Sequence, residues 1–194
     1  MCDGIVVDAH MIRKIRDELV RSSGPLYELI CWVIINCGIA VTPQIEAHWK
    51  TKCSDRDPFF WEWYTQQVLN KSVHDITLQR LEVHITRRIH RDYGLPKDPF
   101  VIGYIECANS TSEPRYIFAE DMYFHDPKAK GLPTKTQVTI RETRSGTLCR
   151  YLERQLRIRV GTATDVNSHF SIGQGPCPNR RTISQSQCPN LPGS

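Results

Sequence analysis

The feature that most constrains this chain is a set of short apolar segments that end at, or close to, an acidic residue. The first is Gly4-Ile-Val-Val-Asp8, in which every residue between the glycine and the aspartate is apolar. A run this short without polar alternation is typical of a strand buried on both faces of a parallel sheet. Similar runs at 39–41, 115–119 and 157–160 are expected to be further strands.

Helical patterns fill the segments between these strands. Apolar side chains recur with helical spacing over 10–22, and prolines at 25, 43, 58 and 99 stand where a helix can begin. Strands that alternate with helices imply right-handed crossovers. The predicted fold class is therefore α/β, a three-layer α/β/α sandwich with a central parallel sheet.

Two segments after residue 70 carry weaker patterns. Residues 77–93 are expected to form one helix, with an apolar stripe at Leu78, Leu81, Ile85 and Ile89. Residues 122–144 are interpreted as a long connection, which could contain a strand at 138–141. A final helix and strand are expected over 145–160.

Length and composition fit one globular domain. Of 194 residues, 40% are hydrophobic, which is enough for a core of its own. We assign 1–161 to this domain and 162–194, rich in Asn, Ser, Gln, Gly and Pro, to a disordered tail. The chain has no long apolar run and no signal pattern, and its 8 cysteines are scattered singly. These features favour a cytoplasmic protein with reduced thiols and no membrane span.

Four acidic residues are expected at one edge of the sheet. Asp8 and Asp121 follow apolar strands, Asp98 begins a helix, and Glu46 lies in the first turn of the helix after the second strand. Open parallel sheets bind ligands at the carboxyl ends of their strands. Carboxylates that converge there repel one another unless divalent cations lie between them. The pattern therefore predicts a Mg²⁺ or Mn²⁺ site.

The sequence around these acids resembles the PIN domain, a family of α/β/α nucleases. The resemblance rests on GIVVDAHMI, GIAVTPQIEAHW, LPKDPFVIGYI and RYIFAEDMYF, and it covers about residues 4–160. It implies that Asp8, Asp98 and Asp121 hold one or two Mg²⁺ or Mn²⁺ ions. It also implies that Glu46 is a further ligand or orients the attacking water.

The resemblance implies metal-assisted hydrolysis of phosphodiester bonds, with single-stranded RNA as the substrate. A metal-bound water attacks phosphorus in line, while the ions neutralise charge on the non-bridging and leaving oxygens. Enzymes of this kind include the toxins of toxin and antitoxin pairs. In such a pair, an inhibitory protein partner would cover the acidic edge.

Three residues differ from the usual PIN pattern and favour an alternative function. His10 stands where the family often has Asn, Ala119 where it often has Ser or Thr, and Tyr123 where a further acid is frequent. The alternative is a PIN-like module that binds nucleic acid or a protein without cleaving it. A structure-specific DNA nuclease fits less well, because the chain is too short for the helical arch of flap endonucleases.

Each of these features also has a structural interpretation. Asp98 before Pro99 is a favourable N-cap, and the other acids could cap helices or face solvent. Arg80, Arg87 and Arg91 are predicted to share a helix face that guides the RNA backbone, and a solvated charged face is the competing interpretation. The aromatic residues of 59–64 could stack bases, but burial in the core or in a homodimer interface is favoured.

Overall fold

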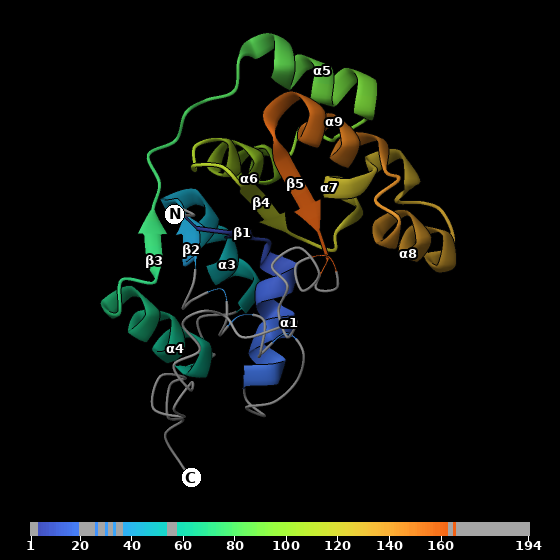
Figure 1. Cartoon of the computed structure of the whole chain (residues 1–194). Helices are drawn as coiled ribbons and strands as arrows, with labels where there is room; N and C mark the ends of the chain where they lie inside the picture. The colour runs from blue at the N-terminus through green and yellow to red at the C-terminus, as the bar shows by residue number, and fades with distance from the viewer. Residues whose placement is uncertain are drawn as a thin grey trace, which may run out of the picture.

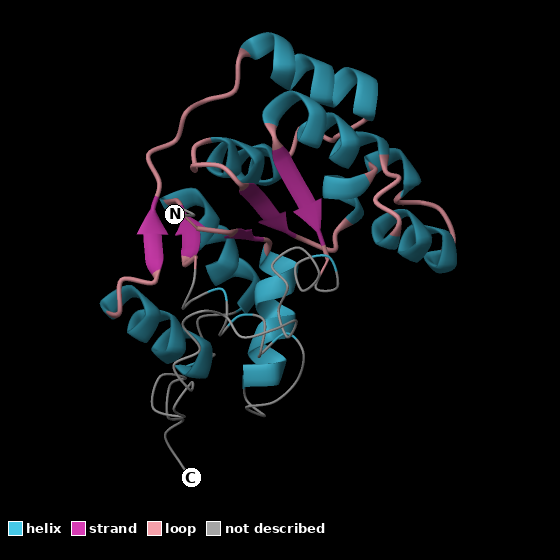
Figure 2. Cartoon of the chain, viewed as in Figure 1, coloured by secondary structure: helices cyan, strands magenta, loops and turns pink. Residues whose placement is uncertain are grey.

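The computed structural model describes residues 4–19, 26, 30, 33, 37–53, 58–162 and 165. Two groups of parallel strands form its centre, as Figure 2 shows in magenta. In the first group β1 (Val6–Val7) pairs with β4 (Arg115–Phe118), which pairs with β5 (Ile158–Gly161). In the second group β2 (Ile39–Val41) pairs with β3 (Val73–Asp75). The architecture of the described residues is therefore mixed α/β, with parallel strand pairing.

A parallel bridge between Ile5 and Ile39 joins the two groups. The N–H of Ile5 donates to the carbonyl oxygen of Gly38, and the N–H of Ala40 donates to that of Ile5, both at 3.0 Å. The strands thus follow the order β3, β2, β1, β4, β5, with β1 between the two outer pairs (Figure 1). The chain builds outward from β1 to β3 and then returns to the other side of β1. Ligand sites in open parallel sheets lie at such a reversal.

The central strands are buried because both of their faces are apolar. Val6, Val7 and Ile39 are each 0% exposed, and so is Ile117 in β4. Of the strand predicted within 4–8, Val6 and Val7 form β1 and Ile5 forms a bridge to Ile39, so the buried strand is present and shorter than predicted. The aromatic helix also contributes to this core, since Phe60, Trp63 and Tyr64 are buried.

Helices in the first half of the chain begin where the sequence predicts. α1 (Ala9–Leu19) follows β1, α3 (Pro43–Cys53) follows β2, and α4 (Pro58–Leu69) precedes β3. α1 and α3 pack against each other. Of the helix predicted from residue 25, the structure describes Leu26, Ile30 and Val33, which are helical and buried. Its remaining residues before Cys37, and residues 20–22 of the preceding prediction, lie outside the described residues.

Helices in the second half cover the sheet. α6 (Pro99–Asn109) contacts β1, β2, β4 and β5, and α9 (Thr147–Leu156) packs on β5. α5 (Val83–Tyr93) lies against α9 at the top of the view in Figure 1. Asp98 caps α6, because its carboxylate accepts the N–H of Phe100 at 2.8 Å. The predicted acid-then-proline helix start is confirmed.

The helix predicted over 77–93 is wrong in its first part. Strand β3 precedes it, the chain then runs without helix to Glu82, and α5 begins only at Val83. The carboxylate of Glu106 in α6 holds this segment, since it accepts the Leu81 N–H at 3.1 Å and Arg80 Nη1 at 2.7 Å. Arg80 therefore does not lie on the helix that carries Arg87 and Arg91.

The strand predicted at 138–141 is also wrong. Residues 122–144 contain α7 (Met122–His125), the short 3-10 helix η1 (Pro127–Ala129) and α8 (Thr134–Glu142). No residue of α8 is buried. Its β-branched residues have no neighbouring strand to pair with, so the helix that starts after Pro133 continues through them.

The end of the chain is described only in part. Of the predicted tail, the structure describes Thr162 and Asp165, and the N–H of Thr162 donates to the Asp165 carboxylate at 2.9 Å. The domain boundary at 161 and the disordered tail stay predictions. Among the described residues no helix has the length and apolarity needed to cross a membrane. The cysteines at positions 37, 53, 107 and 149 are free thiols.

Candidate functional site

Asp8 is a buried acid at the carboxyl end of β1. The residue is 2% exposed, and its Oδ2 accepts the N–H of His10 at 3.3 Å, at the start of α1. Burial, and then the negative charge of Asp121, raises the pKa of Asp8 to about 7. A carboxylate in such a place favours a bound proton or a bound cation over the bare charge.

Asp121 is the second acid at the reversal of strand order. It follows β4 and caps α7, since its Oδ1 accepts the N–H of Tyr123 at 2.9 Å. Both helices that leave the reversal are therefore capped by an acid. Capping and ligand binding are compatible, because each carboxylate has more acceptor positions than one N–H uses.

A histidine and a lysine side chain approach Asp121. His10 Nε2 lies 3.6 Å from Oδ2, and Lys130 Nζ lies 3.7 Å from Oδ1. Lys130 also lies over the ring of Tyr123, 3.3 Å from its centroid. His10 is half exposed and Lys130 is 45% exposed, so an incoming anion can reach both. The edge thus presents two acids together with a lysine ammonium group suited to phosphate oxygens and an exposed imidazole ring.

The other two predicted acids have separate surroundings. Glu46 in α3 pairs with Lys50 at 3.1 Å, one helical turn away. Asp98 caps α6 and lines a pocket beside Arg80 and Lys97. Within the described parts of the chain, no three His, Cys, Asp or Glu side chains form a group that could hold a metal ion. The structure thus pairs Asp8 with Asp121 and does not extend the pair into such a group.

His48 is a residue that the sequence analysis did not select. Its ring stacks on Phe100, with 4.1 Å between centroids, and its Nδ1 lies 3.2 Å from the hydroxyl of Tyr104. Burial is the main cause that lowers the pKa of His48, and the charge of Lys52 and the nearby His10 lower it further. The negative charge of Asp98 raises it. His48 therefore packs on α6, near the end that Asp98 caps. His48 follows Gln44 by four residues, so the two side chains share one face of α3. This spacing is the signal in the sequence from which His48 could have been selected.

The three predicted RNA-binding arginines have different partners. Arg80 pairs with Glu106 at 2.7 Å, and Arg91 pairs with its neighbour Asp92 at 2.7 Å. Arg87 is exposed on α5. The predicted single basic face is therefore reduced to Arg87 and Arg91, and Arg80 belongs to the pocket beside Asp98.

The likeness to the PIN domain rests on the order of the four acids and on their neighbours in the sequence. It stays a prediction, and the function must be argued from the site itself. Comparisons of the chain with family models, curated proteins and solved structures find no match.

Proposed function

We propose that this chain is a metal-dependent endoribonuclease that hydrolyses phosphodiester bonds of single-stranded RNA, on a PIN-like three-layer α/β/α fold. The observation that carries the proposal is the place of Asp8 and Asp121, which follow the two strands, β1 and β4, between which the strand order reverses. This is the position at which open parallel sheets bind ligands. The burial of one acid beside the other adds a reason for a cation to bind there.

The chemistry of the acids fits a hard divalent cation. Asp8 and Asp121 supply carboxylate oxygens, which Mg²⁺ and Mn²⁺ prefer. An ion between them would offset the burial and the repulsion from Asp121 that together raise the pKa of Asp8. Asp98 is the proposed third ligand, and Glu46 the proposed orienter of water. When bound, the ion lowers the pKa of its water and neutralises charge on the phosphate.

The chain's own residues would position the substrate. His10 and Lys130 stand at the exposed side of Asp121, where they can contact phosphate oxygens. The hydrogen bond from the Asp8 N–H to the Phe118 carbonyl oxygen keeps the two strand ends together while the substrate binds. An inhibitory protein that covers this edge, as in a toxin and antitoxin pair, would block access to Asp121.

A specific observation favours a second candidate, a PIN-like module that binds RNA or a protein without cleaving it. Lys130 lies near one oxygen of Asp121 and His10 near the other, so the ammonium group of Lys130 offsets part of the negative charge of the acidic pair. Such an edge can hold an anion without a metal.

The experiment that tests the proposal is cleavage of a labelled single-stranded RNA in Mg²⁺, Mn²⁺, Ca²⁺ or EDTA, read on a gel beside a filter-binding assay. We expect cleavage in Mg²⁺ or Mn²⁺, and its loss in Asp8→Asn and in Asp121→Asn. Asp17→Asn, an exposed acid on α1, is the matched control and should cleave normally. RNA that is retained intact in Mn²⁺ would contradict the nuclease and favour the binding module.

A further inference from the structure

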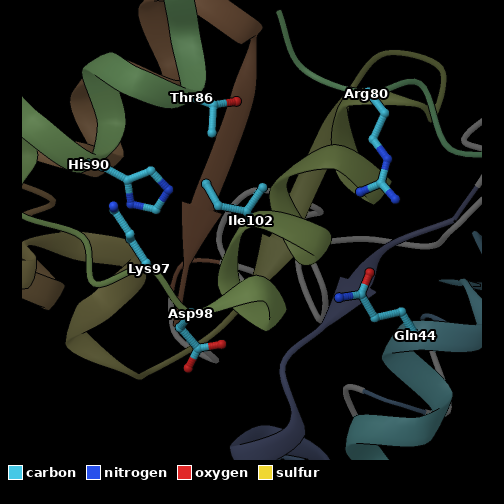
Figure 3. Close-up of a pocket in the computed structure, with 7 residues that line it drawn as sticks. All are labelled: Gln44, Arg80, Thr86, His90, Lys97, Asp98 and Ile102. Carbon is cyan, nitrogen blue, oxygen red and sulfur yellow. The ribbon is translucent and has the colours of Figure 1, made fainter. Parts of the chain in front are cut away.

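A second concave site lies between α3, α5 and the start of α6. It has a volume of about 510 Å³, and Figure 3 shows the side chains that line it. Three of them are basic, namely Arg80, His90 and Lys97. A cavity of this size falls within the range that encloses a small organic ligand.

The basic groups stand at two ends of this pocket. In Figure 3, Lys97 and His90 lie on one side of Ile102, and Arg80 lies with Gln44 on the other. The carboxylate of Asp98 also lines the pocket. A basic side chain therefore stands at each end of the pocket, with the apolar Ile102 between them, and Asp98 adds a carboxylate to the lining.

Arg80 is held in place by a buried acid. The side chain of Glu106 is 5% exposed, and its Oε2 lies 2.7 Å from Arg80 Nη1, whereas the Arg80 side chain is 73% exposed. One nitrogen of the Arg80 guanidinium group is thus held by Glu106. The remaining N–H groups of a side chain this exposed are accessible to a ligand. An arginine anchored in this way loses little freedom when it binds a phosphate.

The other end offers a ring nitrogen and an ammonium group. His90 Nδ1 lies 2.8 Å from the carbonyl oxygen of Leu95, and a carbonyl can only accept, so Nδ1 carries the hydrogen. His90 Nε2 then faces a ligand as an acceptor, which suits a hydroxyl or N–H group and not a phosphate oxygen. Lys97 is exposed, and no ion pair to it occurs among the described residues.

We propose that this pocket binds one nucleotide of single-stranded RNA together with the phosphates on both of its sides. Arg80 would contact one phosphate and Lys97 the other, while His90 Nε2 would accept from a hydroxyl or N–H group of the nucleoside. The uncharged nucleoside would lie against Ile102, with polar groups of Gln44 and Thr86 beside it. The ligand class rests on the proposed function, but the binding itself needs neither a metal nor cleavage.

The experiment compares three ligands by calorimetric titration in EDTA, namely a nucleoside 3′,5′-bisphosphate, the nucleoside 5′-monophosphate and the nucleoside. We expect the bisphosphate to bind about 10-fold tighter than the monophosphate, and the nucleoside weakest. Equal binding of the bisphosphate and the monophosphate would overturn the proposal. A dinucleotide with flanking phosphates should bind at least as well as the free bisphosphate, which separates a strand site from a site for free nucleotides.

Two variants test the two ends separately. Lys97→Glu and Arg80→Ala should each weaken bisphosphate binding about 10-fold and reduce its advantage over the monophosphate. Lys135→Glu makes the same charge change as Lys97→Glu on the exposed first turn of α8 and should leave binding within about 2-fold. An equal loss in Lys135→Glu would show that only net charge matters, and would overturn the pocket.

Two further variants separate a loss of binding from a loss of folding or of cleavage. Arg80→Lys retains a charge beside Glu106 but loses the fork, so it should bind more weakly than the wild type and fold normally. Asp8→Asn should bind the bisphosphate like the wild type in EDTA, whatever its cleavage activity. Bisphosphate binding without any RNA cleavage would therefore contradict the proposed nuclease and support the nucleotide pocket. RNA cleavage without bisphosphate binding would support the nuclease and contradict the pocket.

Discussion

The N–H of Asp8 donates a hydrogen bond of 2.9 Å to the carbonyl oxygen of Phe118. This bond fixes the end of β1 against the end of β4, and Asp121 follows Phe118 by one short turn. The bond thus holds the backbone of Asp8 beside the strand that leads to Asp121. The backbone therefore keeps together two carboxylates that repel each other, and the rest of the fold must offset that repulsion.

The stability of the protein should fall as the pH rises toward neutrality, because of Asp8. In the unfolded chain Asp8 ionises near its ordinary pKa of 3.8, but in the folded chain its pKa is about 7. Between these values only the unfolded state loses its proton, and above pH 7 the penalty is constant, on the order of 4 kcal/mol. Asp8→Asn removes it and retains an acceptor for the N–H of His10. In EDTA, the variant should gain stability over the wild type from pH 4 to pH 7 in urea unfolding.

If the free energy of unfolding changes with pH in the same way for wild type and Asp8→Asn across this range, the raised pKa of Asp8 is contradicted. Asp17→Asn, which changes an exposed acid, serves as the control and should follow the wild type at each pH.

Binding of Mn²⁺ should raise the melting temperature of the wild type. A ligand that binds only the folded state stabilises it by about 1.4 kcal/mol at ten times its Kd, which shifts Tm by a few degrees. The Asp8→Asn, Asp121→Asn double variant should show no such shift, while Asp17→Asn should respond like the wild type. Differential scanning fluorimetry across Mn²⁺ concentrations makes the measurement. An equal shift in the double variant would place the ion elsewhere.

Gly146 should not accept a side chain. A Cβ at this position would lie 2.4 Å from the carbonyl oxygen of His125, which is backbone and cannot rotate away. Gly146→Ala should therefore cost about 1 to 3 kcal/mol by forcing α9 away from α7. Gly131→Ala is the matched control, since a Cβ there meets nothing within 4 Å. Urea unfolding of both variants would show the difference, and equal stabilities would contradict the close approach.

The basic side chains of α5 should determine the salt dependence of RNA binding. If Arg87 and Arg91 each contact a phosphate, reversing both to Glu should lower the slope of log K against log salt by about 1.4, since each contact contributes about 0.7. Filter binding between low and moderate salt gives the slope. The double change Lys135→Glu, Arg154→Glu alters the charge equally at exposed positions of α8 and α9. A slope reduced as much by this control would assign the effect to net charge.

The sequence predicts those elements whose signals are local. The apolar run before Asp8 and the Asp98-Pro99 pair each contain their own reason to form a strand or to start a helix, and both are observed. β3 has no such signal, because Val73 and His74 are only half-buried and Asp75 is exposed. It is a strand because β2 pairs with it, with Ile39 opposite Val73. Pairing between distant segments cannot be read from three residues.

The late start of α5 has a similar cause. Leu78, Leu81 and Ile85 have helical spacing, but the buried carboxylate of Glu106 binds the Leu81 N–H and keeps the segment out of the helix. The candidate site likewise has features that the local sequence predicts and features that depend on the tertiary fold. The positions of Asp8 and Asp121 at strand ends are local properties, whereas their proximity depends on the strand order, and the pocket beside Asp98 depends on three helices meeting.

Because, among the described residues, a single bridge between Ile5 and Ile39 joins the two strand groups, we expect the sheet to divide into two hydrogen-exchange units. The junction needs a glycine at position 4, where φ is +120° and a Cβ would lie 2.8 Å from the backbone nitrogen of Ala40. Opening at this junction releases β2 and β3 together, because the pairing between them does not pass through β1. The Asp8 amide is bonded to Phe118 on the other side, so its protection from exchange should follow that of β4 and β5 rather than that of β2. The two carboxylates thus belong to the half of the sheet that such an opening leaves intact.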